Sequence, residues 1–416
     1  MCCGRNELVT GCWEGEAPAE PLLSANERPH DDKQLVQLRG TARNRVARQE
    51  PRPPETPQIT YSPLLIPLIL SALPTYLYDP ARRGRITSVS SNRYQFRNVA
   101  EGVHFATASD RYAGWLGQIY SEDKGYKITR TQKIIKGTSI AEEKLPVRSV
   151  VEYFEHYTAI ELDFTFYAFL LDGDGNPTRN HAPLVEYAKW LPADAKVILK
   201  VPEAITASRR WMTDGKKRNM ADNPDYLDPV RFTDRFYRPA IEVLGDRIIA
   251  FIFEKGYQRK DSCRPPEDNI THLRAFFERI PRDWRYHIEE RTDRLKTPDY
   301  FAFLHEWSIG NVFSHWTWLP DLRTQWDQAG GFTGAWSITR LLTPLRVAYE
   351  ETYARYHPFA ELKDEFPQMY RDAAFIIDQG LKAGVPTVTV ANNRAGGNAN
   401  EINQRVLNEL RLLEQS

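Results

Sequence analysis

Eight short apolar segments recur along this chain, and amphipathic segments separate most of them. Strands that alternate with helices form right-handed crossover units, which build a parallel sheet. Eight units are the number in a TIM-like (β/α)8 barrel, so we predict an α/β fold of this kind. An open doubly wound sheet is the alternative, although no G-x-G-x-x-G sequence follows any predicted strand. The predicted strands are 103–107, 159–162, 196–201, 248–253, 286–289, 310–313, 335–338 and 387–391.

The segments between the strands carry the helical pattern. Predicted helices span 147–157, 181–191, 229–244, 269–280, 298–307, 361–382 and 400–413, with a short one at 320–328. A typical barrel has ~250 residues, and this one would be longer. We therefore predict two inserts, at 121–144 after the first strand and at 209–228 after the third.

The N-terminal part of the chain differs from the rest. Residues 1–57 are rich in Pro, Glu and Arg without apolar periodicity, so we predict a disordered low-complexity tail. This tail resembles translated sequence upstream of a true start codon. Residues 58–102 are predicted as an apolar and linker segment, and 103–416 as the barrel domain. The apolar run at 62–74 contains three prolines and is shorter than the roughly 20 residues that a spanning helix needs.

The net charge and the cysteine content limit the possible binding partners and the cellular compartment. The formal net charge is +0, which removes the simplest electrostatic case for binding nucleic acid or a membrane surface. Four cysteines form no C-x-x-C pair, so we predict neither a zinc site nor a disulfide framework. A reduced, cytoplasmic setting without membrane contact fits this usage.

Polar residues follow the predicted strands at their carboxyl ends, which meet at the mouth of a parallel barrel. Three cations and several carboxylates at one rim suit an anionic or hydroxyl-rich ligand. A structural network of paired buried charges is the alternative interpretation, and an Asn pair can also simply turn the chain. The residues in question are Ser109, Asp110, Glu161, Asp163, Lys200, Glu254, Glu289, Arg291, His315, Arg340, Asn392 and Asn393.

The sequence gives little support for a multi-zinc site, a serine hydrolase triad or a nucleotide-binding P-loop. His287 and His315 are the histidines near strand ends, whereas a multi-zinc site needs several histidines with carboxylates. No G-x-S-x-G elbow and no P-loop is present. We therefore predict no metal and no cofactor.

Several motifs, in order along the chain, resemble the YecE-like proteins, a bacterial and archaeal family of unknown function. They are YAGWLGQIY at 112–120, IELDFTFY at 160–167, ILKVPEAIT at 198–206, IEER at 288–291, Arg340, and ANN at 391–393. The likeness covers about 103–413. It implies a barrel related to the TIM barrel, and it implies no established activity.

Four positions depart from the family pattern. Asp110 stands where the family has its first Trp, Ala207 where it has a His, and Glu254 where it has a Gln. His315 or a neighbour takes the place of an Asp. Because these positions lie at the predicted rim, we expect a divergent branch with an altered ligand or lost chemistry.

Two hypotheses from different classes follow, with a third that assigns the rim charges a purely stabilising role. The first is an enzyme, a hydrolase or lyase acting on a phosphorylated or sugar-containing substrate. In it Lys200, Arg291 and Arg340 hold negative charge, while Glu161 and Glu289 act as acid and base. The second is a non-catalytic module for a nucleotide or nucleic acid, which would use the same cations and aromatic residues.

The ligand walls and the geometry complete the prediction. Tyr112, Trp115 and Tyr167 are predicted to form the walls, and Asn392 with Asn393 to contact the ligand. The cations and Glu289 are predicted to point into one pocket. Glu161 and Glu289 would face each other ~5–9.5 Å apart if they catalyse glycoside chemistry. If the two carboxylates lie more than ~12 Å apart, or if both are buried in salt bridges with no pocket above them, the binding module becomes the leading hypothesis. The sequence leaves the oligomeric state open.

Overall fold

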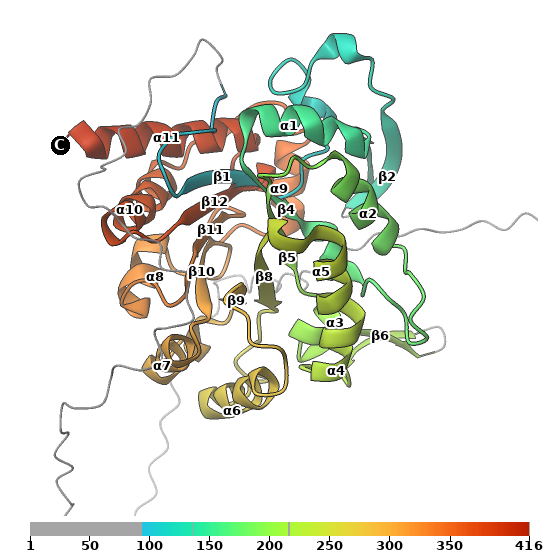
Figure 1. Ribbon diagram of the computed structural model, residues 1–416, viewed down its shortest axis with the longest axis vertical. Helices are drawn as coiled ribbons and strands as arrows, with labels where there is room; N and C mark the ends of the chain where they lie inside the picture. Colours follow the sequence, from blue (N-terminus) through green and yellow to red (C-terminus); the bar gives the residue numbers. More distant parts are fainter. Residues whose placement is uncertain (1–93, 136, 215–216, 416) are drawn as a thin grey trace, which may run out of the picture. The chain divides into compact units, whose positions relative to one another are not determined.

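Eight parallel strands form one sheet in the order β1-β12-β11-β10-β9-β8-β5-β4 in this computed structural model, which describes residues 94–135, 137–214 and 217–415 (Figure 1). A parallel bridge between Ala108 and Glu161 joins the two end strands, so the sheet nearly closes into a barrel. The predicted TIM-like α/β fold is confirmed. The strands are β1 (Val103–Thr107), β4 (Ala159–Leu162), β5 (Lys196–Lys200), β8 (Ile248–Lys255), β9 (Tyr286–Glu290), β10 (Gly310–His315), β11 (Ser337–Leu341) and β12 (Thr387–Ala391).

The predicted strand bounds differ from the structure mainly where a strand ends in charged or polar residues. Strands β1, β4 and β12 have the predicted bounds, but β8 and β10 continue two residues beyond them. The prediction of 335–338 for β11 is wrong, since this strand runs from Ser337 to Leu341 and includes Arg340. In sequence a charged residue marks the end of a strand. Inside this barrel partner charges let such residues remain in the sheet.

Helices follow the strands and cover the barrel (Figure 1). Proline stands in the first turn of α4, α6, α7 and α10, where its missing N–H costs no hydrogen bond. The predicted start of α10 at 361 is therefore wrong, because the helix begins at Pro367. Helix α9 was not predicted. The bounds are α1 (Val150–His156), α2 (His181–Trp190), α3 (Glu203–Thr206), α4 (Pro229–Phe232), α5 (Arg238–Leu244), α6 (Pro266–Phe277), α7 (Pro298–Trp307), α8 (Leu322–Ala329), α9 (Tyr349–Tyr356), α10 (Pro367–Ala383) and α11 (Ala399–Gln415).

Both predicted inserts contain an antiparallel hairpin. Strands β2 (Thr129–Ile135) and β3 (Thr138–Lys144) form the first, and β6 (Arg209–Asp214) and β7 (Lys217–Asp222) form the second. The first hairpin packs against α9, where Ile135 joins an aromatic cluster with Tyr353. The polar composition of these segments predicted that they are inserts, and antiparallel strand pairing gives each of them a regular structure.

The predicted N-terminal segments are described only in part. The tail at 1–57 and residues 58–93 of the linker lie outside the described residues. Residues 94–102 join the core, since Tyr94 and Phe96 are buried and the Arg97 guanidinium donates to the Phe154 carbonyl at 2.8 Å. The folded domain therefore includes residues before Val103. Across the part of the chain that the structure describes, no helix has the length and apolar character to span a membrane.

The alternation of side chains along each strand decides what fills the barrel. Residues two apart share a face of a strand, so Ile198 and Lys200 point the same way, as do Ile252 and Glu254. Apolar residues of this inward face form one buried cluster that includes Ile198, Ile252 and Ile338. The next inward residue toward the carboxyl end is charged on β5, β8 and β11. A charged layer thus lies directly above an aliphatic one.

Candidate functional site

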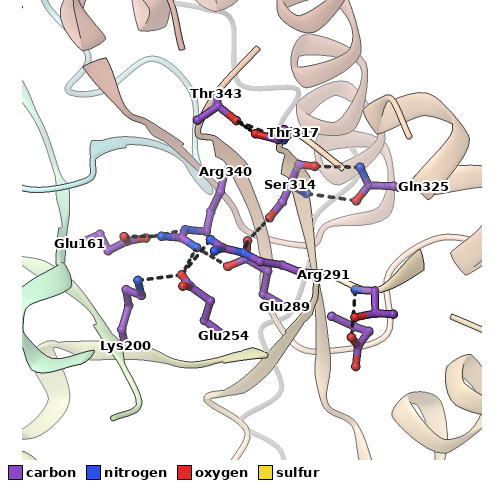
Figure 2. A network of polar contacts seen from close by, with 12 residues as sticks. Glu161, Lys200, Glu254, Glu289, Arg291, Ser314, Thr317, Gln325, Arg340 and Thr343 are labelled. Carbon is purple, nitrogen blue, oxygen red and sulfur yellow. Dashed lines mark hydrogen bonds and ion pairs between the residues drawn. The ribbon is translucent and has the colours of Figure 1, made fainter. Parts of the chain in front are cut away.

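Six charged side chains meet inside the barrel near its carboxyl-terminal mouth (Figure 2). They come from β4, β5, β8, β9 and β11, and from the residue that follows β9. All six are buried, so each charge depends on its neighbours rather than on water. They are three carboxylates and three cations: Glu161, Glu254, Glu289, Lys200, Arg291 and Arg340.

Arg340 is the centre of this charged layer. Its Nε and Nη2 donate to the two carboxylate oxygens of Glu161 at 2.8 and 2.7 Å. Its Nη1 donates to Glu254 at 2.9 Å and also to Glu289. Burial alone would lower the pKa of Arg340, but the three carboxylates outweigh it and hold the pKa above its ordinary value. The guanidinium is therefore a permanent positive charge.

Glu254 gathers the three cations on one oxygen. Its Oε2 accepts a hydrogen bond from Arg340 Nη1 at 2.9 Å and lies 2.7 Å from Lys200 Nζ and 3.0 Å from Arg291 Nη2. Burial raises the pKa of Glu254, but these cations outweigh it and hold the pKa far below its ordinary value. Glu254 was recognised at its strand end but left out of the candidate site. Its place two residues after Ile252, on the inward face, is the signal that could have found it.

Glu289 is held from two sides. Arg291 Nε lies 3.1 Å from its Oε1, and the Ser314 hydroxyl donates to the same oxygen at 2.8 Å. Gln325 fixes Ser314 in turn, because its amide exchanges hydrogen bonds with the Ser314 backbone (Figure 2). Burial raises the pKa of Glu289, but the positive charges of Arg291 and Arg340 outweigh burial and lower the pKa below its ordinary value. The carboxylate is therefore ionised. Neither Ser314 nor Gln325 was predicted from sequence.

A pocket of about 420 Å³, which includes its open mouth, lies over this layer. Predicted site residues from β4, β5, β11 and the loops after β4, β9 and β12 line it. Asp163 and Glu254, which the sequence placed at strand ends without a site role, also line it, and Arg394 was not predicted. Glu289 lies among the buried charges but does not line the pocket. The lining residues are Ala108, Glu161, Asp163, Phe166, Tyr167, Lys200, Glu254, Arg291, Arg340, Leu342, Asn392 and Arg394.

Aromatic rings hold three of the four pocket cations. Lys200 Nζ lies 4.1 Å from the ring centre of Phe166, and Arg291 Cζ lies 4.8 Å from that of Trp316. Arg394 Cζ lies 4.6 Å from the ring centre of Tyr349 in α9. Cation–π contacts of this kind fix the direction of long side chains that would otherwise be flexible. The pocket is therefore lined by cations whose positions are set before a ligand arrives.

Three predicted site residues lie elsewhere. Trp115 is 0% exposed in the core, and Tyr112 packs against it with ring centres 4.9 Å apart. Neither ring lines the pocket. The Asn393 side chain accepts from the Ala399 N–H at 2.8 Å and so holds the start of α11. Of the predicted walls, Tyr167 alone borders the pocket, and of the Asn pair, Asn392.

The histidines and acids of the described residues form no grouping that could bind a metal ion. Among the described residues no cluster of three or more His, Cys, Asp or Glu side chains could hold a metal ion. His315 places Nδ1 2.8 Å from the Thr343 carbonyl oxygen, and burial lowers its pKa to about 4. His287 lies in β9 on the inward face below Glu289, where burial also lowers its pKa.

Comparison with known proteins places the chain among relatives without an assigned activity. A family described as protein of unknown function DUF72 matches residues 142–415. A solved DUF72 family protein from Enterococcus faecalis V583 is similar at 16% identity, with 74% of this chain and 95% of that one covered and a TM-score of 0.46. Another from Thermotoga maritima MSB8 has 15% identity, 75% and 99% coverage and a TM-score of 0.43. No curated protein matches the chain.

Proposed function

The chain belongs to the DUF72 family, which is the YecE-like family of unknown function, and on that premise we propose that it binds a small oxygen-rich molecule at the mouth of its barrel. The ligand class is an anionic or sugar-containing small molecule. The observation that carries the proposal is the convergence of Lys200, Arg291 and Arg340 within 3.0 Å of one carboxylate oxygen beneath an open pocket. Donors set in this way are ready to bind ligand oxygens.

The charge around the pocket is mixed rather than basic. Four cations and three carboxylates line it, and the carboxylate of Glu289 lies just beneath. Donors and acceptors that alternate in a confined space suit a molecule with several hydroxyl groups, since each hydroxyl both donates and accepts. A groove for a nucleic-acid strand would instead follow the backbone with excess positive charge. These features support a compact ligand over a polymer.

Binding is favoured over acid–base catalysis by the state of the two predicted catalytic carboxylates. Both oxygens of Glu161 accept hydrogen bonds from Arg340, and Glu289 contacts the same guanidinium. The lowered pKa of Glu289 keeps it ionised at neutral pH, so it cannot serve as the general acid. We therefore assign Glu161 and Glu289 the role of holding Arg340 in place, which puts the binding module ahead of the hydrolase.

Calorimetric titration tests the proposal. The probes are neutral monosaccharides, their phosphate esters, nucleoside monophosphates and inorganic phosphate. We expect saturable binding of at least one probe. The variant Lys200→Met should weaken that binding about tenfold or more, because one charged hydrogen bond contributes roughly 1.5–3 kcal/mol.

A second lysine serves as the matched control. Lys189 lies exposed on α2, pairs with Glu186 and does not line the pocket. Lys189→Met should leave the affinity unchanged while removing the same charge. Equal losses in the two variants would contradict the assignment of Lys200, and the absence of saturable binding for every probe would refute the proposed function.

A further inference from the structure

The two oxygens of Glu254 have different surroundings. Oε2 lies within 3.0 Å of a nitrogen of each of the three buried cations of the charged layer. Oε1 accepts no hydrogen bond from the described residues, and Glu254 is one of the residues that line the pocket. A carboxylate oxygen accepts hydrogen bonds and cannot donate them while it is ionised. The pocket therefore offers a ligand one strong acceptor at the place where its cations converge.

The charged layer is already neutral before any ligand enters. Glu161, Glu254 and Glu289 balance Lys200, Arg291 and Arg340, three charges against three. A phosphate group would bring excess negative charge to a buried site beside an ionised carboxylate. Like charges in such a place repel strongly because water screens them poorly. A hydroxyl group brings no net charge and can donate to the carboxylate.

We propose that Glu254 Oε1 accepts a hydrogen bond from a ligand hydroxyl, and that Glu254 thereby makes the pocket select an uncharged sugar over its phosphate ester. This inference rests on the proposed function and narrows its ligand class. The cations keep their part, since Lys200 and Arg291 can donate to the oxygens of the same sugar. The acceptor selects the hydroxyl, and the donors hold the ring.

An entering anion could in principle displace Glu254 from its cations. That exchange would break three contacts of 2.7, 2.9 and 3.0 Å. It would also leave the Glu254 carboxylate buried without a counter-charge, because its relative exposure is 4%. An unpaired buried charge is strongly unfavourable. The aromatic contacts of Lys200 and Arg291 further keep the cations where Glu254 holds them.

Titration of wild type and Glu254→Gln with paired probes tests the inference. Each pair is a neutral monosaccharide and its 6-phosphate, measured in the same buffer by calorimetry. Wild type should bind the tighter-binding sugar at least about tenfold better than its phosphate ester. Glu254→Gln keeps the shape of the side chain and removes one negative charge. We expect it to reverse the preference and to gain measurable affinity for inorganic phosphate.

Glu290→Gln is the matched control. Glu290 is the next residue after Glu289 on β9 and is equally buried, but it lies toward Lys255, 3.6 Å away, and does not line the pocket. This variant should retain the wild-type preference for the neutral sugar. Thermal unfolding of each variant checks that it is folded during the titration.

The outcomes separate this inference from the proposed function. If wild type binds the phosphate ester as tightly as the sugar, or if Glu254→Gln leaves their ratio unchanged, the selecting role of Glu254 is refuted while binding at the mouth stands. If Glu290→Gln reverses the preference as Glu254→Gln does, the effect comes from buried charge in general, and the role of Oε1 is refuted. If no probe binds, both proposals fail together.

Discussion

The two ends of the barrel interior are built from the same strands in opposite ways. Near the mouth, β9 and β11 place Glu289 and Arg340 in a dense array of ion pairs. At the other end, β9 places His287 against Gly310 of β10, and the space above is filled by aliphatic residues such as Val312. The lower end is filled mainly by close-packed apolar side chains. The mouth end instead contains buried ion pairs, which rarely make a protein more stable than apolar residues of similar volume would.

This difference indicates where the fold serves a function. Six buried charges are costly to desolvate, and the same strands show that apolar residues can fill such a layer. The stability of the fold alone therefore does not explain why this layer consists of charged residues. An open pocket lies over the charged end, and this placement matches the carboxyl-terminal sites of barrel proteins. Substitutions at either end of the barrel interior test this difference.

The largest effect is expected for Arg340→Met, which leaves three buried carboxylates around a neutral side chain. Breaking a buried charge pair by removing one partner costs about 3–5 kcal/mol of unfolding free energy. Urea denaturation measures the loss. Arg371→Met on the exposed face of α10 is the control and should change the unfolding free energy little. A loss no larger than that of the control would mean that the charged layer does not depend on Arg340.

Gly310→Ala tests packing at the lower end. A Cβ at this position would clash with Cδ2 of His287, so the ring or the strand must shift. Overpacking of this kind costs about 1–3 kcal/mol. Gly173→Ala is a suitable comparison, because nothing lies within 4 Å of a Cβ there. If both variants unfold at the same urea concentration, the lower end is looser than the structure indicates.

Asp110 adds a third case, since it is a buried carboxyl that forms no ion pair with the described residues. Tyr187 donates to its Oδ1 at 2.6 Å, and burial raises its pKa from 3.8 to about 6. A raised folded-state pKa gives stability that is present below pH 3.8 and is lost as the pH rises through about 6.

Asp110→Asn removes this titration while keeping an oxygen for Tyr187. We expect the variant to be about 1 kcal/mol more stable than wild type at pH 8, with the gain absent at pH 3.5. Chemical denaturation at the two pH values measures it. A gain that persists at the lower pH would show that the effect is not titration of Asp110.

The smallest effect on stability is expected for Arg394→Ala. Arg394 lines the pocket but is only partly buried, and its contact with the Tyr349 ring is of the kind that contributes about 0.5–1 kcal/mol. Its loss should lower the unfolding free energy by no more than this amount and should weaken ligand binding. A large loss of stability with unchanged binding would assign Arg394 to the framework rather than to the pocket.

Much of the fold could be predicted because strand and helix periods are local. The bounds of β1, β4, β12 and α7 match the predicted ranges. The error at β11 came from Arg340, which looks like a strand end in sequence and lies within the strand in space. Helix α9 was missed because its packing against the β2–β3 hairpin, through Tyr353 and Ile135, joins segments that are distant along the chain.

The sequence by itself determined that charged residues end the inward face of several strands, since residues two apart share a face. It could not decide which charges meet. Arg340 contacts Glu161 across 179 positions of the chain, and β5, β11 and the residue after β9 bring the cations to one oxygen of Glu254. Nor could it separate Trp115, which the turn after β1 buries in the core, from Tyr167, which borders the pocket. Pairing of buried charges depends on distances between strands, and these are set only when the barrel closes.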